Sequence, residues 1–262
     1  VRFTSGVPEG AVPLAPWTAV DRRAGDRTPD VRRTDGVPLE GRRAVVVDDD
    51  PAVVWFLSGL LRTSGVEVAE AHDGLAARRR VFDGLPDLVV SDVLMPGLDG
   101  FSLCHDIKRD VAVRDVPVIL LSWKEDLLQR VRELGANADG YLRKEAAAST
   151  VLSRVREVLR PRARVESRLR AGGEVRGRLD GMTTRLLLDL TRKSQPNARV
   201  AVRDSVYLYE LDLREGRPLA VTRTATDGSF ERGPRIFDAL IGISAGRFVV
   251  TPSTAHCRDD LK

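Results

Sequence analysis

The stretch DLVVSDVLMPGLDG, residues 87–100, decides the fold. Its short apolar run lies between Pro86 and the turn signal Pro96-Gly97, as expected for an interior strand of a parallel sheet. In open α/β sheets, functional groups gather at the carboxyl ends of the strands. Asp92, at the tip of this strand, should therefore face a crevice instead of the core, and it is the first candidate functional residue.

Alternating strand and helix patterns surround this stretch. Further strands are expected at residues 45–47, 66–71, 116–122 and 138–144. Helices are expected at residues 51–64, 74–82, 100–109, 126–134 and 146–159, the last stopping before Pro161. Five strands alternating with five helices predict an α/β fold, a flavodoxin-like, doubly wound, five-stranded parallel sheet.

Polar side chains stand at four of the predicted strand ends: the acidic triplet Asp48-Asp49-Asp50, then Asp92, Ser122 and Lys144. Each one alone is most simply a solvated loop residue, but together at one sheet edge they indicate a site. Clustered carboxylates repel one another unless a cation neutralises them, and their oxygens suit Mg²⁺. A cation, an ammonium group and a hydroxyl around one carboxylate are suited to placing a phosphoryl group on it.

The blocks VVVDDDP, SDVLMPGLDG, VILLS and GANADGYLRK resemble the four signature blocks of the bacterial response-regulator receiver domain, over residues 42–160. The resemblance implies that Asp92 is the phosphoacceptor. It implies roles for six more residues: Asp49 as direct Mg²⁺ ligand, Asp48 as the second acidic residue, Leu94 as a metal ligand through its backbone carbonyl, Ser122 and Tyr141 as switch residues, and Lys144 as the phosphate-binding lysine. Asp50 follows the acidic pair without a clear role.

Three departures from the family pattern bear on the lifetime of the phosphoryl group. Trp123 stands where a small residue is usual, and Glu145 stands where proline is usual. Leu94 and Lys124 occupy the two positions best placed to hold an attacking water, and neither offers a hydrogen-bond acceptor. None of these changes removes a group needed for phosphorylation, so we expect a long-lived phosphorylated form.

The remaining chain divides by composition. Residues 1–41, with five prolines and no sustained periodicity, are expected to be a disordered linker or tail. Residues 161–173 are expected to be a linker that ends in Gly172-Gly173, and residues 255–262 a tail. Residues 174–254 show the order β, α, β, β, β, α, β of a small α+β domain.

Within 174–254, the motifs LLLDLTRKS, EGRPLAVTRT and FDALIGISAGRFVVTP resemble the PATAN domain, which occurs beside receivers in bacterial signalling proteins. The resemblance implies a protein-interaction module without catalytic residues. The second half of the chain is basic, but its arginines are interspersed with acids and no helix-turn-helix pattern is visible. This pattern argues against nucleic acid as the partner.

Other classes are excluded by simpler observations. The sequence has no run of 18 apolar residues and no signal-peptide pattern, so we expect a cytoplasmic protein without membrane insertion. Cys104 and Cys257 are far apart and lack the spacing of zinc ligands or of a disulfide framework.

The sequence therefore predicts a response regulator of a two-component phosphorelay that uses Mg²⁺ and is not an enzyme acting on an external substrate. Its expected partners are a sensor histidine kinase, an unidentified output protein bound by the C-terminal domain and, as one option, a second copy in a phosphorylation-dependent dimer. One alternative is the receiver part at the C-terminus of a hybrid histidine kinase. The other is a DNA-binding transcriptional regulator.

Overall fold

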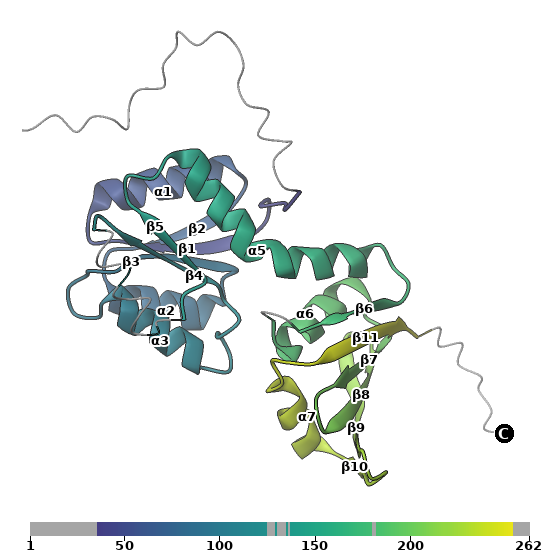
Figure 1. Cartoon of the computed structure of the whole chain (residues 1–262). Helices are drawn as coiled ribbons and strands as arrows, with labels where there is room; N and C mark the ends of the chain where they lie inside the picture. The colour runs from purple at the N-terminus through teal and green to yellow at the C-terminus, as the bar shows by residue number, and fades with distance from the viewer. Residues whose placement is uncertain (1–35, 125–128, 130–134, 136, 180–181, 254–262) are drawn as a thin grey trace, which may run out of the picture. The chain divides into compact units, whose positions relative to one another are not determined.

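The computed structural model describes residues 36–124, 129, 135, 137–179 and 182–253 (Figure 1). The chain divides into two units, residues 1–36 and residues 37–262, and the second unit contains all the elements below. The predicted tail segments at residues 1–35 and 255–262 lie outside the described residues.

The first sheet has five parallel strands, as predicted, and their order is β2-β1-β3-β4-β5. Its strands are β1 (Arg43–Val47), β2 (Glu67–Ala71), β3 (Leu88–Asp92), β4 (Val118–Ser122) and β5 (Gly140–Arg143). Every residue of β3 and β4 is buried, because helices cover both faces of the sheet at these central positions. This explains the continuous apolar runs that end in Asp92 and Ser122.

Helices form the two outer layers around this sheet (Figure 1). They are α1 (Pro51–Thr63), α2 (Gly74–Gly84), α3 (Gly100–Arg109) and α5 (Ala148–Arg170). Buried side chains of α1 and α5 share one apolar cluster with β1 residues such as Val46, whereas those of α2 and α3 share another with Val45 and Val47. The two clusters show the alternation of strand side chains between faces. The predicted helix at 126–134 lies outside the described residues, apart from Gln129.

A second, antiparallel sheet follows, with strand order β10-β9-β8-β7-β11-β6. Its strands are β6 (Val175–Arg178), β7 (Ala198–Arg203), β8 (Tyr207–Arg214), β9 (Arg217–Ala225), β10 (Phe230–Arg232) and β11 (Arg247–Pro252). Helices α6 (Thr184–Ser194) and α7 (Pro234–Ile241) pack into the same apolar cluster as its inward residues. The short strand β10 is an addition to the predicted order.

The linker predicted at residues 161–173 is largely wrong, because α5 continues through Pro161 to Arg170. A proline inside a helix loses one hydrogen bond and crowds the preceding turn. Tertiary contacts offset this cost: Ala163 is buried in the cluster that covers the first sheet, and Leu169 in the cluster of the second domain. One helix therefore contributes to both hydrophobic cores.

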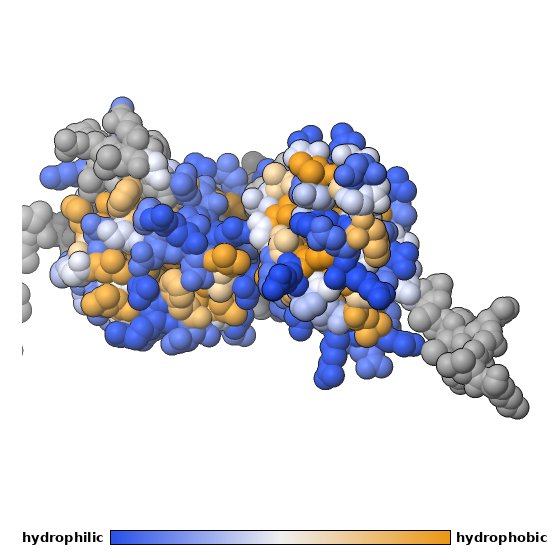
Figure 2. All heavy atoms as spheres, turned by 90° about the horizontal axis from the view of Figure 1, so that it is seen from below, coloured by the Kyte–Doolittle hydropathy of each residue, from blue (hydrophilic) through white to orange (hydrophobic). Residues whose placement is uncertain are grey.

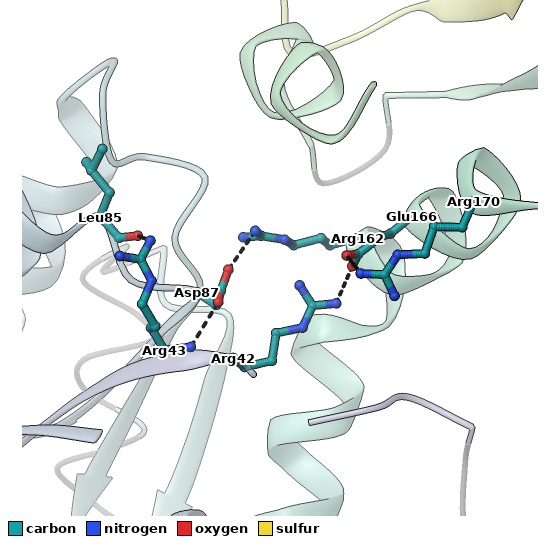
Figure 3. A network of polar contacts seen from close by, with 7 residues as sticks. All are labelled: Arg42, Arg43, Leu85, Asp87, Arg162, Glu166 and Arg170. Carbon is teal, nitrogen blue, oxygen red and sulfur yellow. Dashed lines mark hydrogen bonds and ion pairs between the residues drawn. The ribbon is translucent and has the colours of Figure 1, made fainter. Parts of the chain in front are cut away.

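Ion pairs also hold the second half of α5 (Figure 3). Arg162 pairs with Asp87 at 2.6 Å, and the other oxygen of Asp87 accepts a hydrogen bond from the Arg43 backbone N–H. Glu166 pairs with Arg42 and, at 2.6 Å, with Arg170. We call these residues, Arg42, Arg43, Asp87, Arg162, Glu166 and Arg170, the α5 network.

The expected tail at residues 1–41 is wrong at its C-terminal end. Val37 and Leu39 are buried, and both belong to the apolar cluster formed by α1, α5 and the first sheet. The Gly41 N–H also donates a hydrogen bond to the Gly65 carbonyl, 2.9 Å away. The first domain therefore begins at about Val37, because these two apolar side chains complete its core.

Candidate phosphoacceptor and metal site

The carboxyl ends of four parallel strands bring together polar and charged residues predicted for the site. Asp48 directly follows β1, Asp92 and Ser122 are the last residues of β3 and β4, and Lys144 directly follows β5. The strands are neighbours in the order β1-β3-β4-β5, so these side chains share one edge of the sheet. All four residues are buried, although all are polar or charged.

Lys144 links two of the carboxylates. Its ammonium Nζ lies 2.7 Å from Oδ2 of Asp48 and 2.9 Å from Oδ2 of Asp92. The three side chains are 3%, 0% and 7% exposed, respectively, so bulk water screens these contacts little. A buried cation between two buried carboxylates leaves one negative charge uncompensated.

Asp49 adds a third carboxylate from the exposed side. One oxygen from each of Asp48, Asp49 and Asp92 lies within 4.8 Å of the other two, as one small cation would require. Among the residues that the structure describes, this is the only such group of three or more metal-ligating side chains. The donor set is entirely oxygen, which fits a hard cation such as Mg²⁺.

Burial sets the electrostatics of the site. Desolvation raises the pKa of Asp48 and that of Asp92 above the usual carboxyl range, although the hydrogen bond from Lys144 works in the opposite direction at both. Burial also disfavours the charged form of Lys144, but its hydrogen bonds to Asp48 and Asp92 outweigh this effect and raise its pKa. The lysine therefore stays charged, while the carboxylates gain from any added positive charge.

Backbone packing positions Asp92. The N-terminus of α3 is in such close contact with the end of β3 that a Cβ at Gly100 would lie 1.9 Å from the Asp92 carbonyl oxygen. Asp99 caps this helix by accepting a hydrogen bond from the Ser102 backbone N–H at 2.7 Å. Asp99 and Gly100 thus fix the path of the chain that follows Asp92.

The predicted switch residues occupy neighbouring strands. Ser122 Oγ accepts a hydrogen bond from the Lys124 backbone N–H at 3.1 Å, which leaves its hydroxyl proton available for donation. Tyr141 lies opposite Leu120 in the β4–β5 pair and packs, partly buried, against the cluster beneath α2 and α3. Ser122 therefore lies at the strand end next to that of Asp92, whereas Tyr141 lies on the following strand, β5.

The residues that depart from the family pattern surround the site in different ways. The Lys144 ammonium lies 5.6 Å from the centre of the Trp123 ring, within the range of a cation–π contact. Leu94 is 60% exposed and Lys124 is also exposed, so both side chains are open to solvent beside Asp92 and Ser122. Glu145 forms an ion pair with Arg143 at 2.6 Å instead of joining the cluster.

Two features of the site were not predicted from the sequence. Asp50 is the N-cap of α1, where its carboxylate accepts a hydrogen bond from the Ala52 N–H at 2.9 Å; the Asp-Pro pair at a strand-to-helix junction is the signal for this role. The contact of Trp123 with Lys144 was also missed. It follows from the pairing of β4 with β5, which places Ser122 opposite Arg143.

Comparison with known proteins agrees with this geometry. Residues 44–156 match the family model described as the response regulator receiver domain. The DNA-binding dual master transcriptional regulator RpaA of Synechocystis is 32% identical over 123 residues, which cover 47% of this chain and 51% of RpaA. The response regulator MprA of Mycobacterium ulcerans is 39% identical over 118 residues, which cover 45% of this chain and 50% of MprA. The chain thus spans about half the length of these curated relatives.

Solved structures match the same part of the chain. The chemotaxis response regulator CheY4 of Vibrio cholerae shares 25% identity, with a TM-score of 0.43, over 45% of this chain and 98% of CheY4. The receiver domain of a histidine kinase from Syntrophus aciditrophicus shares 34% identity, with a TM-score of 0.42, over 46% of this chain and 91% of that chain. The resemblance of residues 174–254 to PATAN domains stays a prediction. Residues 44–156 are a response regulator receiver domain.

Proposed function

We propose that this protein is a response regulator that accepts a phosphoryl group on Asp92 from a histidine kinase and signals through protein contacts of its C-terminal domain. The observation that carries the proposal is the position of the Lys144 ammonium, 2.9 Å from the Asp92 carboxylate beside two further carboxylates. The protein acts on no external substrate and works in the cytoplasm, where its kinase delivers the phosphoryl group.

The transfer uses groups that are already in place. An Asp92 oxygen attacks the phosphorus of the kinase's phosphohistidine, an oxygen–phosphorus bond forms, and the phosphorus–nitrogen bond breaks with its electron pair left on the imidazole. Lys144 holds an oxygen of the transferred group, and the Ser122 hydroxyl donates a hydrogen bond to it. Mg²⁺, held by Asp48, Asp49, Asp92 and the Leu94 carbonyl, would neutralise charge on the phosphoryl oxygens. Tyr141 changes position with Ser122 in the phosphorylated form.

The proposed output through protein contact is assigned to the C-terminal domain. Its described residues, from 174 to 253 without 180 and 181, hold no group of three metal-ligating side chains. They form an antiparallel sheet with two short helices, α6 and α7. No helix in the described part of the chain is long and apolar enough to span a membrane.

The test is phosphorylation of the full chain by acetyl phosphate with Mg²⁺, followed by intact mass measurement. We expect one phosphoryl group per chain and none on Asp92→Asn. The matched control is Asp83→Asn, which changes an exposed carboxylate on α2 and should label like the wild type. Full labelling of Asp92→Asn would overturn the assignment.

DNA binding is the second candidate function. It is favoured by the name of one relative, the DNA-binding regulator RpaA, although the match covers only 47% of this chain. Salt-dependent binding of duplex DNA by the full chain, lost when arginines of the C-terminal domain are replaced, would support this candidate.

A further inference from the structure

The second domain has an open groove where its sheet meets α7. A hollow of about 700 Å³ is lined by residues of β8, β9, β10 and α7. A second hollow, of about 290 Å³, lies beside α6 and shares Leu211, Pro218 and Phe237 with the first. The shared residues make the two hollows one continuous depression. We call it the α7 groove, and its apolar lining includes Leu188, Leu211, Pro218, Leu219, Phe230 and Phe237.

Apolar surface is exposed in this groove. Leu219 is 64% exposed and Phe230 is 60% exposed, although both are large apolar residues of strands. Among the described residues of the second domain, the only other large apolar residue with comparable exposure is Val206. Figure 2 shows hydrophobic residues gathered on this domain with hydrophilic residues around them. An apolar surface rimmed by charges is typical of a binding site.

The charges around the α7 groove are predominantly basic. The groove and an adjoining hollow of about 340 Å³ beside Gly216 are lined by five basic and three acidic side chains. These are Arg185, Arg192, Lys193, Arg217 and Arg232 against Asp189, Glu215 and Asp238. Arg192 pairs with Asp189 at 3.4 Å, but Arg185, Arg217 and Arg232 form no ion pair with any described residue. An acidic occupant would complement them.

The rest of this chain does not offer such an occupant. Residues 1–35 contain six arginines against five acidic residues, so this segment is itself slightly basic. Residues 254–262 contain two basic and two acidic residues and are neutral. A second copy of the domain would bring the same arginines toward the groove and add repulsion. The charge pattern therefore favours a different protein.

The lining of the groove also indicates the form of the occupant. Apolar side chains from two helices and three strands create it, so recognition depends on inserted side chains more than on backbone pairing at a strand edge. A helix with apolar residues at i, i+3, i+4 and i+7 presents such a row along one face. Acidic residues along the borders of that row would meet Arg217 and Arg232.

We propose that the α7 groove binds an acidic amphipathic helix of a partner protein. This inference rests on the proposed function, because it assigns the surface through which the C-terminal domain contacts its output protein. The apolar row fills the space above Leu211 and Phe237, and the acidic borders pair with the unpaired arginines.

The probe is a fluorescein-labelled peptide of about 16 residues with leucine on one helical face and glutamate elsewhere, long enough to form a helix when bound. Binding to the full chain is measured by fluorescence anisotropy. One control peptide has the same composition in scrambled order. The other has lysine in place of every glutamate. We expect the designed peptide to bind at least tenfold more tightly than either control, and more weakly as salt increases.

Substitutions in the α7 groove test whether the peptide binds there. Leu219→Asp and Arg217→Glu should each weaken binding at least tenfold, and both positions are exposed, so the fold should tolerate them. The matched controls Val206→Asp and Arg247→Glu, also exposed but outside the groove, should bind like the wild type. Absence of binding, equal binding of the scrambled peptide, or no effect of Leu219→Asp would each overturn the inference.

Two further measurements, of DNA binding and of phosphorylation, distinguish a peptide groove from a nucleic-acid site and from failure of the proposed receiver function. A labelled DNA duplex that binds more tightly than the peptide, and is lost with Arg217→Glu but retained with Leu219→Asp, would overturn the inference in favour of nucleic acid. The same protein samples are treated with acetyl phosphate. Normal labelling of Asp92 without peptide binding overturns the groove alone. Peptide binding without labelling of Asp92 overturns the proposed receiver function and leaves the groove supported.

Discussion

Neighbouring residues at the candidate phosphoacceptor site differ in their contacts, as Asp49 and Asp50 illustrate. Asp49 places an oxygen near those of Asp48 and Asp92, whereas the Asp50 carboxylate accepts the Ala52 N–H and caps α1. We therefore expect these adjacent aspartates to contribute to different properties, Asp49 to metal affinity and Asp50 to helix stability. Substitution by alanine should separate the two.

We expect Asp49→Ala to weaken Mg²⁺ binding at least tenfold with little loss of stability, since it removes one of the three clustered carboxylates from an exposed position. Asp50→Ala should retain Mg²⁺ binding and lower the free energy of unfolding by about 1 kcal/mol, through loss of the N-cap. Mg²⁺ titration followed by Trp123 fluorescence, with Trp17 and Trp55 replaced by phenylalanine, measures the first effect. Urea denaturation measures the second. Equal loss of metal affinity in both variants would contradict the prediction.

We expect the lifetime of phospho-Asp92 to depend on nearby residues that cannot activate water. Leu94 offers no hydrogen bond from its side chain, Lys124 offers donors only, and Trp123 occupies space beside Lys144. We expect Leu94→Asn combined with Lys124→Glu to speed dephosphorylation about tenfold or more, since each restored contact lowers the barrier by about 1.4 kcal/mol.

The measurement follows loss of the phosphoryl group after removal of the donor, by mass spectrometry. Trp123→Ala alone tests the steric contribution and should also be faster than the wild type. Val206→Asp, which is remote from the site, should decay at the wild-type rate. A double variant no faster than the wild type would show that other groups control the lifetime.

Among the secondary-structure elements, α5 shows how distant contacts override local preference. Arg162 is mostly buried, and burial lowers the pKa of its guanidinium group, while Asp87 opposes this effect. Asp87 also accepts the backbone N–H of Arg43 at the start of β1. One carboxylate thus connects the sheet to the helix turn that follows Pro161.

We expect Asp87→Asn to lower the free energy of unfolding by about 3 kcal/mol, because it leaves a largely buried arginine without its counter-charge. The control is Asp212→Asn, whose partner Arg199 lies 2.7 Å away on an exposed strand face. That variant should lose less than about 1 kcal/mol. Urea denaturation of both variants gives the comparison, and equal losses would refute the role of the α5 network.

The central strands and the site could be predicted because their signals are local. Continuous apolar runs mark β3 and β4, and the polar residue that ends each run identifies the functional edge. The extension of α5 could not be predicted in this way, because the residues that hold it, Arg42 and Asp87, lie far away in the sequence. The strand β10 was missed because three residues show no periodicity.

For the whole molecule, α5 makes the receiver larger than its family match. The match ends at residue 156, but Ala163 is buried in the receiver's core and Glu166 pairs with Arg42. Leu169 is the first α5 residue buried in the core of the second domain. The physical boundary between the two cores therefore falls between residues 163 and 169.

We expect a chain of residues 36–167 to be more stable than a chain of residues 36–160 by about 3 kcal/mol, because the shorter chain lacks the partners of Asp87 and Arg42. Urea denaturation of the two chains measures the difference. Asp87→Asn in the longer chain should remove most of its advantage. Equal stability of the two chains would contradict this prediction and place the end of the first domain at about Pro161.

The position of this boundary limits how such a gene can recombine. A gene fusion joined at residue 156, the end of the family match, would produce a receiver in which Asp87 and Arg42 lack their counter-charges. A joint after Glu166, or an incoming domain that begins with a helix carrying an arginine and a glutamate four residues apart, would restore them. Exchange of output domains in this lineage should therefore favour partners that begin in mid-helix.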